Sequence, residues 1–292
     1  MSKVLDYLLS GIFWFLSILP LSFLYALSYI VRFLVYHVVG YRKKVVRENL
    51  KNSFPELSER ERLKIEKDFY LYLCDSFFES IHIMNMSRDE ISRRMQFNNS
   101  ELLDHYISQG RSVILCLGHY GNWEWIPSMT LQIKEECVLA QLYRPLNNKF
   151  FDQFYLNIRQ KWGAKSVPKS ETLREIREIR EQGKQFVMGF MADQTPSPSN
   201  IHYWTNFLNQ ETPVLTGPEK ISVKGNYVVV YLDIKHIKRG YYTGEYVLIT
   251  DRPKEEAPFY ITETYTRMME NTIRRSPAYW LWTHKRWKHK KA

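Results

Sequence analysis

The chain has 292 residues, 45% of them hydrophobic and 15% aromatic, which is enough to bury a full core as one large domain or as a domain with appendages. Lys and Arg number 41 against 31 Asp and Glu, so the formal net charge is +10 and anionic partners are expected. The three cysteines, Cys74, Cys116 and Cys137, have neither metal-type spacing nor an even pairing, which argues against a zinc site or a disulfide framework and predicts buried thiols in a reducing compartment.

The first forty residues predict membrane attachment. Tyr7–Val31, "YLLSGIFWFLSILPLSFLYALSYIV", is a 25-residue stretch without a charge, long enough to cross a bilayer and too long for the apolar core of a signal peptide. Pro20 is expected to kink it, or to split it into a span and a re-entrant or surface-lying piece. The basic residues Arg32 and those of "YRKK" (Tyr41–Lys44) follow the apolar stretch. Because positive charge gathers on the cytoplasmic side of a span, the bulk of the chain is expected on that side. The alternative is a buried core helix.

The remaining chain predicts one α/β domain. Residues 1–45 are interpreted as the membrane anchor and residues 46–292 as a catalytic-type domain. Ser58 and Glu61 form a capping box that begins an amphipathic helix. The expected strands are Ser112–Leu117, Cys137–Leu142, Phe186–Met191, Tyr227–Ile234 and Tyr246–Ile249. The expected helices between and after them are Asn122–Leu131, Lys149–Trp162, Glu171–Gln182 and Tyr260–Arg274. This alternation predicts a mostly parallel sheet flanked by helices.

The stretch "VILCLGHYGNWEW" (Val113–Trp125) carries the main chemical signal. His119 follows an apolar strand, and ligands of open α/β sheets bind beyond the carboxyl ends of the strands. Glu124 falls in the first turn of the expected helix, from which its carboxylate could orient the imidazole as a general base. The spacing alone favours the alternative, a packed structural histidine, because a Glu five positions after a His is a common coincidence.

The motif "GHYGNWE" resembles the first motif of glycerolipid and lipid A acyltransferases, a His followed after four residues by an acid. The Glu and the internal Gly-Asn-Trp are similar to the lauroyl/myristoyl branch of lipid A biosynthesis. Further blocks resemble that branch in the same order: "RENLKNSFPELSERER" (47–62), "YRPLNN" (143–148), "IRQKWGAKSVPK" (158–169), "MADQ" (191–194) and "SPAYWLWTHKRWK" (276–288). The resemblance covers nearly the whole chain and implies a glycerolipid acyltransferase-like fold.

The resemblance implies transfer of a fatty acyl group from an acyl carrier protein or CoA thioester to a hydroxyl of a membrane lipid, most closely a lipid A precursor. His119 would deprotonate the acceptor hydroxyl and Glu124 would orient the imidazole, which makes these two the candidate catalytic residues. The thioester is a co-substrate, and no cofactor or metal is required. The implied location is the cytoplasmic side of the bacterial inner membrane.

Five further residues are assigned supporting roles. Arg159, and less strongly Arg144, would hold a phosphate or stabilise the oxyanion, because a guanidinium binds oxygens in a fork and keeps its charge. Asp193 would clamp an arginine of the site or order the following loop. Asn122 and Gln194 are interpreted as hydrogen-bonding support.

The segment Asn271–Ala292 contains seven Lys or Arg and no acid. An anionic membrane surface or an acidic carrier protein is preferred as its partner over nucleic acid, and a merely solvated terminus is the alternative. The functional alternatives are a lysophospholipid, glycerolipid or aminolipid acyltransferase, a thioester hydrolase, and a non-enzymatic membrane-tethered binder of lipid or carrier protein.

Overall fold

The structure is a computed structural model that describes residues 3–291. Its helices are α1 Lys3–Ile18, α2 Leu21–Phe33, η1 Leu34–Val38, α3 Lys43–Ser53, α4 Glu59–His82, α5 Arg88–Arg94, α6 Glu101–Ser108, η2 Trp123–Leu131, α7 Lys149–Gln160, η3 Lys169–Glu171, α8 Thr172–Glu181, η4 Pro198–Asn200, α9 Gly217–Gly225, α10 Tyr260–Arg275 and η5 Pro277–Tyr279. Its strands are β1 Met95–Asn98, β2 Val113–Leu117, β3 Val138–Tyr143, β4 Lys165–Pro168, β5 Phe186–Met191, β6 Trp204–Phe207, β7 Gln210–Pro213, β8 Val228–Lys238 and β9 Tyr241–Thr250.

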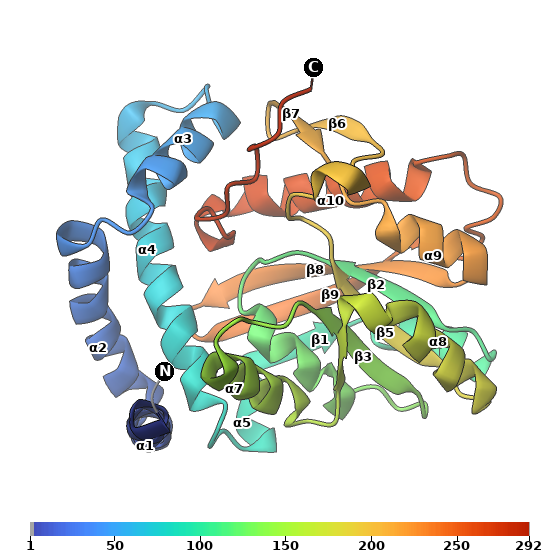
Figure 1. Cartoon of the computed structure of the whole chain (residues 1–292), viewed down its shortest axis with the longest axis horizontal. Helices are drawn as coiled ribbons and strands as arrows, with labels where there is room; N and C mark the ends of the chain where they lie inside the picture. The colour runs from blue at the N-terminus through green and yellow to red at the C-terminus, as the bar shows by residue number, and fades with distance from the viewer. Residues whose placement is uncertain (1–2, 292) are drawn as a thin grey trace.

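Seven strands form one sheet in the order β1-β9-β8-β2-β5-β3-β4. Every neighbouring pair in this described sheet is parallel except the β8–β9 hairpin. Helices α9 and α10 cover one face, whereas η2, α5 and α7 lie toward the other (Figure 1). The predicted α/β class with a mostly parallel sheet is therefore confirmed.

Strand β2 lies at the centre of the core. All five of its residues are buried, as a continuous apolar run predicts for a parallel strand covered on both faces. It pairs with β5 so that Leu117 lies opposite Met191. The residues that follow these two strands therefore emerge side by side at one edge of the sheet.

The apolar N-terminal stretch forms two helices rather than one. Helix α1 ends at Ile18, and α2 begins immediately after Pro20, because proline lacks the N–H that a continuous helix requires. One helical run, Leu21–Val38, is long and apolar enough to cross a membrane by length and composition, and Val4–Ile18 is a shorter apolar helix. Pro20 thus divides the stretch into two helices, while the assignment of a membrane span and the division at residue 45 stay predictions.

Helix α4 separates these N-terminal helices from the sheet (Figure 1). It begins with the predicted capping box, in which Ser58 Oγ accepts from the Glu61 N–H and the Glu61 carboxylate accepts from the Ser58 N–H. Its first two turns are largely exposed, whereas most residues from Phe69 onward are buried. Buried side chains of α4 therefore contact α2 as well as the core of the sheet domain.

Two local predictions need correction. The helix expected over Asn122–Leu131 is a 3₁₀ segment, η2, which contains Pro127; the ring of this proline prevents a regular α-helix. The short strand expected over Tyr246–Ile249 is part of the longer β9, which turns back from β8 as a hairpin at Gly240, with a φ of +73°.

Candidate active site

His119 and Asp193 meet where β2 and β5 end. Each lies two residues beyond the paired positions Leu117 and Met191. The Nδ1 atom of His119 is 2.7 Å from Asp193 Oδ1, and the backbone N–H of His119 donates to Asp193 Oδ2 over 2.9 Å. Because a carboxylate can only accept, the imidazole proton resides on Nδ1, and Nε2 keeps a lone pair.

Asp193 is buried and fully engaged. Trp280 Nε1 also donates to its Oδ2 over 2.9 Å. Burial opposes ionisation, but the neighbouring His119 and the donated hydrogen bonds outweigh it and lower the pKa of Asp193 to about 2. The site therefore keeps a permanent negative charge behind the imidazole.

The outer nitrogen of His119, Nε2, lies against the Gln194 side chain. Gln194 Nε2 lies 3.3 Å from His119 Nε2, and the His119 side chain is 18% exposed. The Trp123 ring packs edge-on against the imidazole, with centroids 5.5 Å apart. A hydroxyl that replaced the Gln194 amide at Nε2 would meet a base whose other nitrogen is already oriented.

Glu124 does not orient His119, which corrects the contact expected from their spacing. Its carboxylate binds Arg159 in a fork, with Nε–Oε2 at 2.7 Å and Nη2–Oε1 at 2.6 Å, and accepts from Trp123 Nε1 over 3.0 Å. Burial tends to lower the pKa of Arg159, but Glu124 outweighs this and raises it. Trp123 thus contacts both pairs, His119–Asp193 and Glu124–Arg159.

Asn122 and Arg144 lie apart from the imidazole. Asn122 is buried and donates from Nδ2 to Glu79 Oε2 over 2.6 Å. Arg144 is exposed in the segment that follows β3. Sequence reasoning missed Glu79 altogether and assigned Trp280 no role, although Trp280 falls inside the quoted C-terminal block.

The motif loop contains two glycines in different settings. A Cβ on Gly118 would lie 2.4 Å from Cε at the tip of the Met269 side chain and 3.3 Å from Asp193 Cγ, so a larger residue there would require the methionine side chain to move. Gly121 has a φ of +58° and receives a hydrogen bond on its carbonyl from Tyr72 Oη over 2.7 Å. These positions explain the glycines of "GHYGN".

The C-terminal segment completes the loop. The Gly121 N–H donates to Tyr279 O over 2.9 Å, and the Leu281 N–H donates to His119 O over 3.2 Å. Tyr120 and Trp280 form an isolated antiparallel bridge. Residues more than 150 positions apart in the chain therefore hold His119 from two sides.

The three cysteine thiols are not candidates for the catalytic nucleophile. Cys74 and Cys116 are buried and Cys137 is half-buried, as predicted. Burial raises the pKa of the Cys116 thiol to about 12 and that of Cys74 to about 11, so neither supplies a thiolate near neutral pH.

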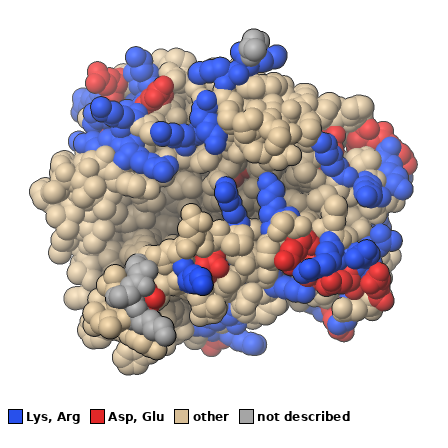
Figure 2. Space-filling view, viewed as in Figure 1, with Lys and Arg blue, Asp and Glu red and all other residues tan. Residues whose placement is uncertain are grey.

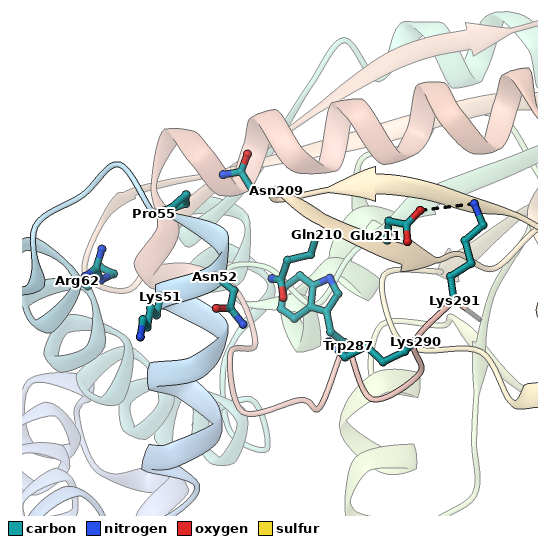
Figure 3. Close-up of a pocket in the computed structure, with 10 residues that line it drawn as sticks. All are labelled: Lys51, Asn52, Pro55, Arg62, Asn209, Gln210, Glu211, Trp287, Lys290 and Lys291. Atoms are coloured by element: carbon teal, nitrogen blue, oxygen red, sulfur yellow. Dashed lines mark hydrogen bonds and ion pairs between the residues drawn. The ribbon is translucent and has the colours of Figure 1, made fainter.

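A cationic cleft, separate from the His119–Asp193 pair, lies between α3, the β6–β7 hairpin and the C-terminal segment (Figure 3). It has a volume of about 660 Å³ and is lined by Lys51, Asn52, Pro55, Arg62, Asn209, Gln210, Glu211, Trp287, Lys290 and Lys291. Four of these side chains are cationic and one is anionic, and Glu211 lies 3.5 Å from Lys291. Figure 2 shows Lys and Arg gathered in the region of α3 and the C-terminal segment on this side of the molecule.

Two tryptophan side chains connect the cationic cleft to the His119 site. Trp287 packs against Trp280 with ring centroids 6.1 Å apart, and Trp280 is the donor to Asp193. A bound anionic partner would therefore lie two aromatic side chains away from the buried carboxylate.

Comparison with known proteins gives two matches. The family model described as bacterial lipid A biosynthesis acyltransferase matches residues 1–289. A lipid A biosynthesis lauroyltransferase from Escherichia coli (strain K12) is 23% identical over 288 residues, covering 95% of this chain and 89% of that protein.

Proposed function

Because this chain belongs to the bacterial lipid A biosynthesis acyltransferase family and is an acyltransferase, we propose that it moves a fatty acyl chain from an acyl carrier protein thioester to a hydroxyl of a lipid A precursor. The observation that carries the proposal is the His119–Asp193 pair, set at the carboxyl ends of adjacent parallel strands. His119 is the residue of the first motif whose imidazole is held at Nδ1 by a buried carboxylate while Nε2 keeps a lone pair that can accept a proton.

In the proposed reaction, Nε2 of His119 takes the proton of the acceptor hydroxyl as its oxygen attacks the thioester carbonyl carbon. The tetrahedral intermediate collapses with cleavage of the C–S bond, and the imidazolium returns the proton to the leaving sulfur. Asp193 keeps the Nδ1 proton in place and stabilises the imidazolium, as the carboxylate of a catalytic triad does.

Arg159 is proposed to face the developing oxyanion or a substrate phosphate. Glu124 occupies Nε and Nη2, so Nη1 is the nitrogen that this carboxylate does not use. Glu124 therefore acts as the residue that fixes the guanidinium, and its role in the reaction runs through Arg159 rather than through His119.

We also propose that α1 and α2 attach the protein to the inner membrane, with the catalytic domain on the cytoplasmic side. Large apolar side chains are exposed on both helices: Val4, Leu5, Tyr7, Leu8, Ile12, Trp14, Phe15, Ile18, Phe23, Tyr29, Ile30 and Phe33. Such a surface is typical of a membrane-contacting element. The basic residues Arg42, Lys43 and Lys44 follow the apolar run, which favours the cytoplasmic orientation.

The function is tested by mass spectrometry of lipids from cells with and without the gene. The expected result is a lipid A species that loses the mass of one fatty acyl chain when the gene is removed and regains it on complementation. A loss confined to glycerophospholipids would instead indicate a lysophospholipid acyltransferase.

The cationic cleft is proposed to recognise the acidic carrier protein of the donor. Lys51→Glu combined with Lys290→Glu should raise KM for a carrier-protein thioester about tenfold and leave kcat nearly unchanged, because charge at a rim mainly alters association. Lys254→Glu is the matched control, since Lys254 is exposed but lines a different cleft. KM is measured for the carrier-protein thioester and for the CoA thioester of the same acid.

The CoA thioester distinguishes the two possible ligands of the cleft. KM for this donor should change little, because CoA lacks the acidic protein surface. An equal rise for both donors would contradict carrier-protein recognition and assign the cleft to a smaller anion.

A further inference from the structure

Three buried carboxylates of α4 accept hydrogen bonds from the N-terminal helices. Glu66 accepts from Tyr36 Oη over 2.7 Å, Asp75 accepts from Ser28 Oγ, and Glu79 accepts from Tyr25 Oη over 2.7 Å. These acids are 2%, 5% and 0% exposed. Hydrogen bonds to buried carboxylates therefore connect the N-terminal helices to α4 at three points along its length.

Glu79 differs from the other two because it also reaches the motif loop. Its Oε2 accepts from Asn122 Nδ2 over 2.6 Å and from Tyr242 Oη over 3.1 Å, while Oε1 accepts from Tyr25. The backbone carbonyl of Glu79 accepts from Trp125 Nε1 over 3.3 Å. Of these three acids, Glu79 is thus the one that contacts α2, β9 and both flanks of the Trp123–Glu124 pair.

Asn122 links the motif loop to Glu79 through its side-chain amide. Asn122 Oδ1 is buried without a hydrogen-bond partner among the described residues, whereas Nδ2 points at Glu79. Leaving a buried carbonyl oxygen unpaired is costly, so the Glu79 contact outweighs the alternative amide orientations. The Asn122 backbone, with φ −90° and ψ 83°, lies outside helix and strand and depends on such side-chain support.

We propose that Glu79 is a positioning residue that couples the seating of α2 to the geometry of the motif loop. This inference rests on the proposed function, because it assigns the loop to acyl transfer. Moving the Glu79 carboxylate would release Asn122 Nδ2 and so shift the residues that follow Asn122, including Glu124 and its pair with Arg159, while the Trp125 indole stays bonded to the Glu79 backbone carbonyl. Acyl transfer then depends on a hydroxyl of the N-terminal helix that lies outside the site.

The test compares two tyrosines of α2 in the full-length protein. Tyr25 and Tyr29 both lie against the Arg239 guanidinium, whose Cζ is 4.3 Å from the Tyr25 ring centroid and 4.7 Å from the Tyr29 ring centroid. Of these two tyrosines, Tyr25 is the one that donates to Glu79. Tyr25→Phe should lower kcat about tenfold with KM within about twofold, as expected for loss of one hydrogen bond to a charged group. Tyr29→Phe should behave as wild type. Both are assayed with the carrier-protein thioester and a lipid A precursor.

Glu79→Ala completes a double-mutant cycle, because alanine, unlike glutamine, leaves no acceptor for the Tyr25 hydroxyl. It should lower kcat by more than about tenfold, and adding Tyr25→Phe should cause little further loss, because both changes remove the same contact. Thermal unfolding of each variant separates this effect from destabilisation: kcat per folded molecule must fall. Equal kcat for Tyr25→Phe and Tyr29→Phe, or losses that simply multiply, would overturn the coupling. If the wild-type protein transfers no acyl group, the proposed function fails instead.

Discussion

Replacing His119 by alanine should lower kcat by about 10²–10⁴-fold, the range that a general base contributes. Asp193 holds Nδ1 of the His119 imidazole, and Nε2, which lies beside the Gln194 amide, is the nitrogen assigned to the acceptor hydroxyl. KM for the donor should change little, because the ring is assigned to proton transfer rather than to binding. Steady-state kinetics with purified protein, checked by thermal unfolding for an intact fold, measures the effect.

His105→Ala is the matched control for this change. His105 is exposed on α6 and bonds to Gln109 rather than to Asp193, so its replacement should leave kcat unchanged. Added imidazole should restore part of the lost rate in His119→Ala, since alanine leaves space where the ring stood. A His119→Ala protein with wild-type kcat would remove the general-base role altogether.

Asp193→Asn should lower kcat by about 10²–10⁴-fold while the fold is retained, because asparagine has nearly the same shape but no charge. The amide can present its N–H₂ to Nδ1, which then holds the wrong tautomer and moves the proton to Nε2. Glu124→Gln is the informative comparison, since it weakens the grip on Arg159 without touching the imidazole. Full kcat in Asp193→Asn, with loss only in Glu124→Gln, would return the orienting role to Glu124.

The same carboxylate has a defined pH dependence. The pKa of Asp193 in the fold is about 2, below the value of about 3.9 for an unperturbed Asp, so its ionised form stabilises the fold. This contribution is complete above about pH 4 and is lost as the pH falls toward about 2. The unfolding temperature of Asp193→Asn should therefore vary less with pH across this acidic range than that of wild type. Because Asp193 is already ionised well below neutral pH, any fall in kcat between about pH 4 and 7 is assigned to a different group.

The sequence alone predicted the strands on which the site depends. Residues 113–117 and 186–191 are long apolar runs, and such runs are typical of parallel strands that are buried on both faces. Placing His119 at the end of a strand followed directly from the first of them. The four-residue strands β1 and β4 escaped prediction because they lack a continuous apolar run.

The partner of His119 could not be predicted in the same way. The choice of Glu124 relied on closeness in sequence, whereas Asp193 reaches the imidazole only because β5 pairs with β2. Strand order is a long-range property that no local pattern of one sequence encodes. Glu79 was missed for a related reason: a carboxylate on a predicted amphipathic helix is normally exposed, and its burial depends on what packs against that helix.

Residues 279–281, which bond to the motif loop, come late in the chain, and this has a consequence for synthesis of the protein. Trp280 supplies a donor to Asp193, and Tyr279 and Leu281 bond to the backbone around His119. During synthesis, a nascent chain that ends before residue 279 has both His119 and Asp193 but lacks all three contacts. We therefore expect the contacts around His119 and Asp193 to be completed only after this stretch has left the ribosome, long after α1 and α2 have emerged.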